Sequence, residues 1–260
     1  SFKMPQWISY AKIRGSYANV GNDIPARITN PTGWVNYTGT VTPNTTAPFG
    51  DLKPEISSSL EFGTEWHFFN DRLTLDFTWY KTNTQNQLFS LPAPAGSGYT
   101  YYYVNAGNIQ NMGTEIILGI TPVMTNDFLW KTQFNMSQNK NTVISLHDEL
   151  PKFTISDSAN DAYRMYLEKG GSYGDFYGYD FDRDENGKIK YDDNGLPIKN
   201  GKLVKLGNAT PDFLLGWNNT FDYKGFSLGF LVDCRFGGQA LSMTQADLDL
   251  YGVTEVTAKA

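Results

Sequence analysis

The stretch Ser58-Ser59-Leu60-Glu61-Phe62-Gly63-Thr64-Glu65-Trp66-His67-Phe68 decides the fold class of this chain. Its even positions carry mostly apolar side chains, and its odd positions carry polar or small ones. Successive side chains of a β-strand point to opposite faces, so a repeat of two predicts a strand with one apolar face. After the turn at 69–72 the alternation resumes at 73–80, which predicts a β-hairpin.

The same alternation returns farther along the chain. Residues 112–136 and 213–235 each predict another hairpin, and a less regular strand at 7–18 precedes them all. Ile117 breaks the alternation in its strand, because it is apolar at a polar position. Together these patterns predict an all-β chain with about seven strands.

The links between the predicted strands alternate between short turns and long polar segments. The long segments cover approximately residues 19–54, 90–111 and 139–211. Structureless loops of that length are uncommon in compact soluble domains. Outer-membrane barrels have short periplasmic turns and long extracellular loops, between strands of about 9 to 11 residues. The sequence therefore predicts an antiparallel transmembrane β-barrel segment.

In such a barrel the apolar side chains face lipid and the alternate set faces the lumen. The predicted lipid-facing residues are Leu60, Phe62, Trp66, Leu75, Phe77, Ile116, Phe134, Leu215 and Phe230. The predicted lumen-facing residues are Glu61, Glu65, Asp76, Glu115, Lys131 and Asp233. One alternative stays open, because a soluble secreted carbohydrate-binding β-sandwich module also has strands with one apolar face.

The composition excludes several classes of function. The net charge is -6 and the basic residues are scattered, whereas nucleic-acid binding requires clustered Lys and Arg. Cys234 is the only cysteine, so no disulfide and no multi-cysteine metal site can form within the chain. No stretch approaches the roughly 18 apolar residues of a membrane helix. A membrane-spanning form of this chain would therefore cross as strands.

Short motifs follow one another in a specific order along most of the chain. They are Leu52-Lys53-Pro54-Glu55, Glu61-Phe62-Gly63-Thr64-Glu65-Trp66, Asn70-Asp71-Arg72-Leu73, Asn105-Ala106-Gly107, Gly113-Thr114-Glu115, Gly170-Gly171-Ser172-Tyr173-Gly174-Asp175, Leu206-Gly207-Asn208, Pro211-Asp212-Phe213, Phe226-Ser227-Leu228, Arg235-Phe236-Gly237-Gly238 and Leu248-Asp249-Leu250-Tyr251-Gly252-Val253. In this ordered combination the chain resembles TonB-dependent outer-membrane transporters, and within them the SusC/RagA branch found in Bacteroidota.

The resemblance implies a barrel of about 22 strands around an N-terminal plug. Residues 1–260 would be part of a single TonB-dependent receptor β-barrel domain, with the plug domain and the C-terminal strands absent from this chain. It also implies a multi-pass protein of the outer membrane of a Gram-negative bacterium, which imports a nutrient with energy delivered through TonB. An oligosaccharide (glycan) is the first choice of cargo and a peptide is the second. The implied partners are a SusD-like surface lipoprotein and the TonB complex, contacted through the missing N-terminal part.

The sequence does not predict an enzyme. His67 and His147 are far apart in the chain, and no nucleophile motif accompanies either of them. Asp175, Asp180 and Asp182 are candidates for the acid pair of a glycoside hydrolase, but we predict no strand around them that would hold two carboxylates at a fixed separation. We therefore expect no catalytic residue. Substrate-binding residues stay unassigned, because nothing in the sequence distinguishes them.

Residues 182–193 follow the pattern of an EF-hand calcium loop. Oxygen donors occupy positions 1, 3 and 5, and glycine occupies position 6, where the loop turns sharply. Position 12 is an Asp, one methylene shorter than the usual Glu, which weakens the expected binding. The predicted ligands of a weak extracellular Ca²⁺ site are Asp182, Asp184, Asn186, the carbonyl of Lys188, and Asp193. A solvated polar hairpin is the alternative interpretation.

Overall fold

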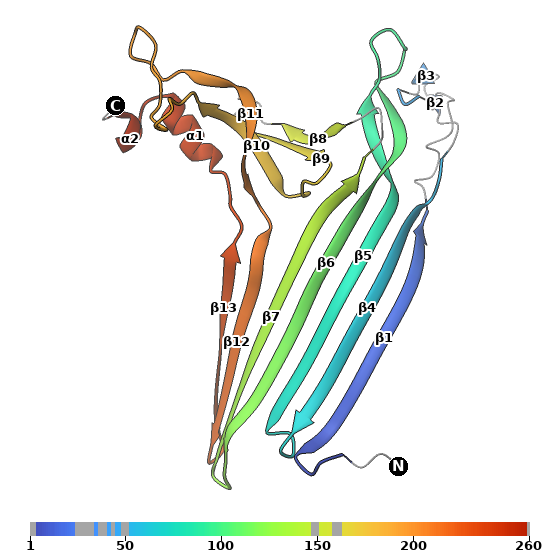
Figure 1. Ribbon diagram of the computed structural model, residues 1–260, viewed down its shortest axis with the longest axis vertical. Helices are drawn as coiled ribbons and strands as arrows, with labels where there is room; N and C mark the ends of the chain where they lie inside the picture. Colours follow the sequence, from blue (N-terminus) through green and yellow to red (C-terminus); the bar gives the residue numbers. More distant parts are fainter. Residues whose placement is uncertain are drawn as a thin grey trace.

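A computed structural model describes residues 4–23, 34–35, 41–42, 45–47, 52–146, 151–157 and 163–258 of the protein. Its longest strands are β1 (Ile8–Asn22), β4 (Glu55–Phe68), β5 (Leu73–Pro92), β6 (Tyr101–Met124), β7 (Phe128–Ser145), β12 (Pro211–Tyr223) and β13 (Phe226–Gly237). They form one antiparallel sheet in the order β1-β4-β5-β6-β7-β12-β13 (Figure 1). We call this seven-stranded sheet the wall.

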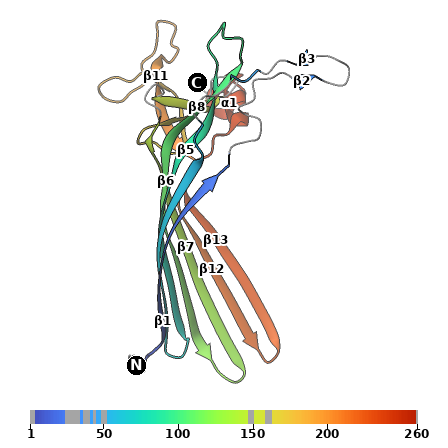
Figure 2. The same cartoon turned by 90° about the vertical axis from the view of Figure 1, so that its right-hand side faces the viewer.

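Smaller elements gather at one end of the wall. Four short strands form a second sheet, which we call the rim sheet: β8 (Lys152–Asp157), β9 (Arg164–Glu168), β10 (Asp175–Phe181) and β11 (Lys199–Asn208). The remaining elements are β2 (Trp34–Val35), β3 (Val41–Thr42), α1 (Met243–Leu250) and α2 (Glu255–Ala258). Figures 1 and 2 show the rim sheet and α1 at the end of the wall opposite the N-terminus. No helix in the described ranges has the length and apolar character needed to cross a bilayer.

Short turns join the wall strands at one end only (Figure 1). In the first turn Phe69, Asn70 and Asp71 all have positive φ angles. In the last turn Lys224 has φ 48° and Gly225 has φ 89°, and two positive φ values give a turn whose twist matches that of the flanking strands. The long connections lie at the opposite end, which we call the rim end. This confirms the predicted asymmetry of the connections.

The strand register places the two predicted sets of side chains on opposite faces of the wall. One continuous row across the apolar face reads Ala11, Trp66, Leu75, Leu118, Phe134, Trp217 and Val232. The residues predicted to face the lumen all occupy the alternate positions of the same pairings. Ile117, the exception noted in the sequence, lies on that polar face beside Asp76 and is 44% exposed.

Three polar side chains on the apolar face accept hydrogen bonds from tryptophans, and the first is Thr64, which accepts one of 2.6 Å from Trp66. Thr132 accepts a hydrogen bond of 2.8 Å from the indole Nε1 of Trp217, and Asn219 accepts one of 3.1 Å from Trp130. Asn219 is only 1% exposed. Burying a polar group without a partner is costly, so each pairing satisfies an indole donor and a side-chain oxygen together. The face therefore presents mainly apolar groups to its surroundings, although polar residues interrupt its sequence.

The wall is a single layer of protein, and the buried core lies at the rim end. The core cluster contains Ile109, Val143 and Leu167, with Phe89 and Phe153 packed against it. These residues come from β5, β6, β7 and the rim sheet, which meets the wall chiefly where β9 contacts β7. A β-sandwich needs two sheets packed face to face over a common core. In the described residues no second sheet covers the apolar face of the wall, so the sandwich alternative is wrong.

All three predicted long links contain strand residues, which corrects the sequence analysis. The 19–54 link contains the end of β1 and the short strands β2 and β3. Strands β5 and β6 continue to Pro92 and Tyr101, so most of the 90–111 link is paired. The 139–211 link contains the end of β7 and the whole rim sheet. Apolar and polar residues alternate along a strand only where the strand separates an apolar environment from a polar one. Beyond the apolar band both faces of β5 carry polar side chains such as Asn83 and Thr84, so the strand continues without the signal.

Ile116 and Ile117 are neighbours of one residue type on opposite faces, and they form a matched pair for testing which face meets lipid. Ile116→Arg in the full-length protein should destabilise it by about 2 to 4 kcal/mol, because a charge near the bilayer midplane of a barrel costs that much. Ile117→Arg should be tolerated, since it lies beside Asp76. Urea unfolding in lipid vesicles measures both variants. Equal losses would contradict the assignment of faces.

Candidate functional site

Strand β7 pairs with β12 along only part of its length. Their pairing ends at Ser137 and Leu214, and beyond it the turn between β9 and β10 lies beside β7. Gly170 N donates to the carbonyl of Val143 at 2.8 Å, and Val143 N donates to the carbonyl of Gly171 at 2.8 Å. The turn therefore extends the sheet along β7 in place of β12. It brings the Gly-rich motif of residues 170–175 onto the wall.

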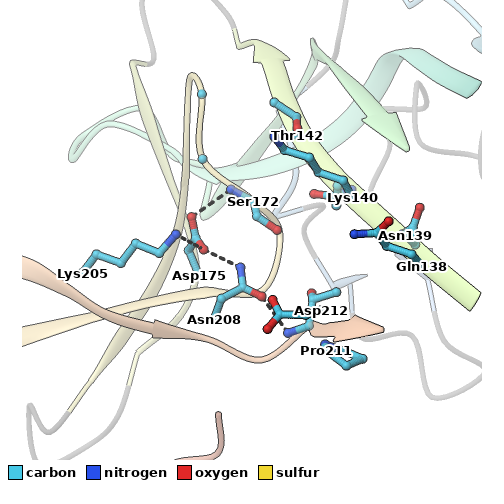
Figure 3. A pocket seen from close by; sticks show the side chains of 14 residues that line it. Gln138, Asn139, Lys140, Thr142, Ser172, Asp175, Lys205, Asn208, Pro211 and Asp212 are labelled. Atoms are coloured by element: carbon cyan, nitrogen blue, oxygen red, sulfur yellow. Dashed lines mark hydrogen bonds and ion pairs between the residues drawn. The ribbon is translucent and has the colours of Figure 1, made fainter. Parts of the chain in front are cut away.

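Asp175 is the centre of this junction and is 1% exposed (Figure 3). Its carboxylate is 2.6 Å from Nζ of Lys205 and accepts a 2.9 Å hydrogen bond from the backbone of Ser172. Asn208 donates its side-chain amide to the same carboxylate. Burial opposes ionisation, but Lys205, Asn208 and Ser172 outweigh it and hold the pKa of Asp175 below its ordinary value. We call these four residues the rim latch.

The latch is connected to the strands that follow it. Asn208 accepts a 2.6 Å hydrogen bond from the backbone of Thr210, and Ala209 N donates to the carbonyl of Gly174 at 2.8 Å. Arg235, on β13, donates to the carbonyl of Ala209 at 2.6 Å. A Cβ at Gly174 would lie 2.7 Å from Oγ1 of Thr210, so this close approach requires glycine. The latch therefore ties the rim sheet to β12 and β13.

A polar depression of about 370 Å³ lies beside the latch (Figure 3). Residues 138–142 of β7 form one side, and the latch with the start of β12 forms the other. Most of its lining residues have amide, hydroxyl, lysine or carboxylate side chains, with Gln138, Asn139, Lys140, Thr142 and Asp212 among them. Such a lining offers hydrogen bonds to a polar ligand or to water.

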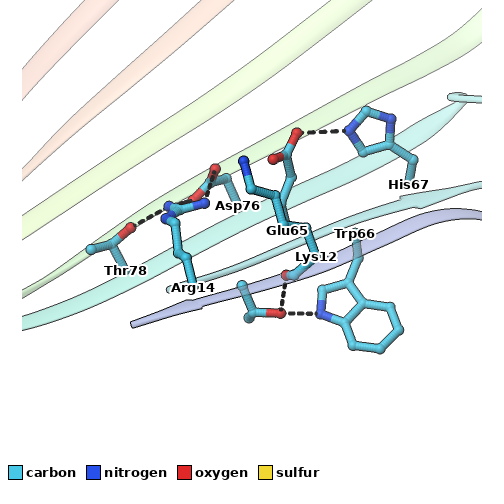
Figure 4. A network of polar contacts seen from close by, with 8 residues as sticks. Lys12, Arg14, Glu65, Trp66, His67, Asp76 and Thr78 are labelled. Carbon is cyan, nitrogen blue, oxygen red and sulfur yellow. Dashed lines mark hydrogen bonds and ion pairs between the residues drawn. The ribbon is translucent and has the colours of Figure 1, made fainter. Parts of the chain in front are cut away.

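The polar face of the wall carries an ion-paired network (Figure 4). Arg14 on β1 reaches over β4 to Asp76 on β5 at 2.6 Å and donates to Thr78 at 2.7 Å. Gly63 lies between them, and a Cβ there would come within 2.4 Å of Nε of Arg14. The glycine thus leaves the space through which the arginine crosses a whole strand. Trp66 points to the other side of the sheet in the same view (Figure 4).

The histidines and carboxylates considered as catalytic candidates have other contacts. His67 lies on the polar face, within 2.7 Å of Asp71 and 3.2 Å of Glu65, and His147 lies outside the described residues. Contrary to our prediction, a strand does hold part of the proposed acid pair, because β10 carries both Asp175 and Asp180. Asp175, however, is buried against Lys205, so it is not available to a substrate.

The predicted calcium segment forms an exposed hairpin with two similar turns. The carboxylate of Asp184 accepts hydrogen bonds of 2.9 Å from the backbone N–H groups of Asn186 and Lys188. Asp192 makes the same kind of turn with Asn194 and Leu196, at 2.9 and 2.8 Å. Within the described residues no three acidic, histidine or cysteine side chains converge as metal ligands. These contacts do not test calcium binding, and the site stays a prediction.

The described geometry defines a class of protein. A single-layer sheet with continuous pairing, one apolar face, one ion-paired face, short turns at one end and a folded rim at the other is a segment of a transmembrane β-barrel wall. The family model described as TonB dependent receptor-like, beta-barrel matches residues 4–247. The chain therefore belongs to the TonB-dependent receptor β-barrel family.

Individual relatives agree with this assignment. TonB-dependent receptor P3 of Formosa agariphila is 31% identical over 76% of this chain and 22% of its own length. TonB-dependent receptor SusC of Bacteroides thetaiotaomicron is 26% identical over 69% of this chain and 19% of its own length. The solved structure of the RagAB peptide transporter superimposes with a TM-score of 0.70 at 22% identity, covering 89% of this chain and 27% of that one. The chain thus spans about a quarter or less of these relatives.

The buried charge of Asp175 provides a test of the latch. Asp175→Asn in the full-length protein should loosen the rim sheet by on the order of 1 to 3 kcal/mol, because Lys205 and the Ser172 N–H lose the buried carboxylate with which they pair. Amide hydrogen exchange of residues 164–181 measures the opening. Asp180→Asn is the matched control, since that carboxylate lies on the same strand but is 43% exposed. Equal exchange in the two variants would contradict the latch.

The direction of the pKa shift adds a pH dependence to this test. A folded pKa below the ordinary value means that the latch is fully formed above the ordinary aspartate value of 3.8 and weakens only as pH falls through the lower folded value. The opening free energy of residues 164–181 should therefore stay constant from neutral pH down to about the ordinary value of 3.8, and it should fall as the pH drops from there through the lower folded value. An earlier loss of protection would show that Asp175 is not held as a carboxylate.

The calcium prediction has a matched pair of variants. Asp184→Asn keeps the turn oxygen but removes a ligand charge, so it should abolish Ca²⁺ binding with a dissociation constant of about 10⁻⁴ to 10⁻³ M. Asp192→Asn makes the same change in the second turn, outside the predicted ligand set, and should leave binding intact. Isothermal titration calorimetry with Ca²⁺ measures both. Absence of binding to the unaltered protein at millimolar Ca²⁺ would show that the segment is only a polar hairpin.

Proposed function

We propose that the full-length protein actively imports a nutrient across the outer membrane of a Gram-negative bacterium, with energy delivered through TonB. Membership of the TonB-dependent receptor β-barrel family supports the proposal. The observation that carries it is the polar face of the wall, where Arg14, Asp76 and Thr78 form a network opposite an apolar face. A water-facing lumen needs such a lining, whereas the lipid side must be apolar. The import step itself involves no covalent chemistry.

We propose an oligosaccharide as the cargo, with a peptide as the second candidate. The ordered motifs of the SusC/RagA branch support both choices, and RagAB is described as a peptide transporter. The polar depression beside the rim latch has the amide and hydroxyl groups that would suit either ligand. Deciding between them requires uptake measurements with both classes of nutrient.

The proposed partner is a SusD-like lipoprotein, seated on the rim end of the wall. Figures 1 and 2 show that the rim sheet, the β5–β6 hairpin and the hairpin of residues 182–198 stand beyond the wall strands. Phe181, Tyr191 and Leu196 are exposed on or beside that hairpin, and exposed apolar residues on a projecting element favour a protein contact. In this proposal the rim latch holds the platform on which the lipoprotein rests.

Deletion of the full-length gene tests the import proposal. Growth on at least one glycan or peptide source should be lost, and plasmid-borne expression of the gene should restore it. Removal of TonB should abolish the same uptake, because import against a gradient needs delivered energy. Uptake that survives loss of TonB would indicate a passive porin. Unchanged growth of the deletion strain on every glycan and peptide source would contradict import.

A further inference from the structure

Only two charged side chains occupy the apolar face within the registered part of the described wall strands. They are Lys81 on β5 and Lys140 on β7, and both are lysines. The acidic residues of the wall, together with Lys12, Arg14 and Lys131, occupy the alternate positions and lie on the polar face. The lipid-facing side of the wall therefore carries positive charge and no negative charge in this region.

The two lysines lie in one row across the sheet. The register pairs Tyr17 with Leu60, Leu60 with Lys81, Lys81 with Met112, and Met112 with Lys140. Two strand spacings separate the lysines, which is about 10 Å. The next row toward the turn end is apolar beside Lys81, with Phe62 and Trp79, and polar beside Lys140, with Thr114 and Gln138. The next row toward the rim is polar, with Asn83, Gln110 and Thr142.

The position of this row matches the edge of a bilayer. Lys81 is the ninth residue of β5, counted from Leu73 at the turn end. A tilted strand crosses the hydrocarbon in about 9 to 11 residues. Lys81 therefore lies where the apolar band ends on the rim side, at the level of the lipid headgroups. Because the strands are tilted, Lys140 lies in the same row but farther from the turn end of its own strand, as the thirteenth residue of β7. Long lysine side chains reach such a boundary while their stems stay in contact with apolar surface.

Neither lysine has a partner among the residues that the structure describes. Lys81 and Lys140 form no ion pair or hydrogen bond with any described residue, whereas Lys152, Lys190 and Lys205 each pair with a carboxylate. Met112, which is 38% exposed, lies between the two lysines and provides an apolar floor. Asp175, the buried carboxylate of the described residues, is already paired with Lys205. The charges at this row are thus complementary to an external anion.

We propose that Lys81 and Lys140 bind the phosphate groups of an anionic lipid in the outer leaflet of the membrane. This inference rests on the proposed outer-membrane location, which sets the apolar face against lipid. A phosphate-bearing headgroup would lie across Met112, with one lysine on each side, and its acyl chains would continue along Trp79 and Phe77. The interaction fixes the height of the wall in the membrane.

The test uses the full-length transporter in vesicles of phosphatidylcholine that contain a small fraction of diphosphoryl lipid A. Native mass spectrometry of the extracted protein measures how strongly that lipid is enriched. Lys81→Gln and Lys140→Gln should each lower the enrichment about fivefold, which corresponds to about 1 kcal/mol for each lysine near a charged lipid surface. Lys131→Gln, on the opposite face, is the matched control and should change nothing. Lys81→Arg and Lys140→Arg should retain the enrichment.

Two further arms identify the source of the phosphate. Dephosphorylated lipid A should show no enrichment, and inorganic phosphate at millimolar concentration should not displace the bound lipid. Equal binding of the phosphate-free lipid, or unchanged enrichment in the Lys81→Gln, Lys140→Gln double variant, would overturn the proposal. Displacement by inorganic phosphate would show a simple anion site and would overturn it as well.

The outcomes separate this inference from the proposed function. If the lysine variants bind the lipid normally while TonB-dependent uptake is intact, the lipid site is wrong and the import proposal stands. If the lysines control lipid enrichment but uptake does not depend on TonB, the import proposal fails and the lipid site stands.

Discussion

The pairing of backbone amides in a medium without water is the constraint on which this structure depends. Each unpaired N–H or C=O in the hydrocarbon costs several kcal/mol, so every wall strand must pair along the whole distance it spends there. Register then becomes continuous, and a shift of one residue would turn every lipid-facing side chain inward. The continuous row of paired residues from Ala11 to Val232 is an example of this register. Because backbone hydrogen bonds between strands hold the wall together, it needs no second layer of protein. The buried core of the described residues lies at the rim, around Val143 and Leu167.

The part of the fold that could be predicted consists of the strands that have an apolar environment on one face and a polar environment on the other. Residues 58–68 alternate because Phe62 and Trp66 meet one environment while Glu61 and Glu65 meet the other. Above the apolar band β5 and β6 meet water or the rim core instead of lipid, so backbone pairing continues without a repeat of two in hydropathy. The rim sheet was missed for the same reason. Its strands are short, and Tyr166, Leu167 and Tyr177 are buried by contacts with distant segments.

The candidate site was harder to predict than the wall, because its residues are joined by side-chain hydrogen bonds across the sequence. Asp175 and Asn208 belong to two motifs that the sequence presents separately, and nothing in their spacing shows that they touch. Gly63 is a different case. A glycine on the polar face of a regular strand has no side chain to place, and its neighbour in the ladder, Arg14, is the longest cation on that face. That combination is a usable signal for a side chain that crosses a strand.

The tryptophans of the apolar face have a consequence for how the wall accommodates its membrane. An indole usually lies at the water boundary because its N–H group needs a partner there. Trp66, Trp130 and Trp217 already donate to Thr64, Asn219 and Thr132 within the sheet. These rings are therefore free of any requirement for a particular depth, and a thicker bilayer can cover them without breaking a hydrogen bond. Hydrophobic mismatch at this side of the barrel should be absorbed by the lipid at little cost.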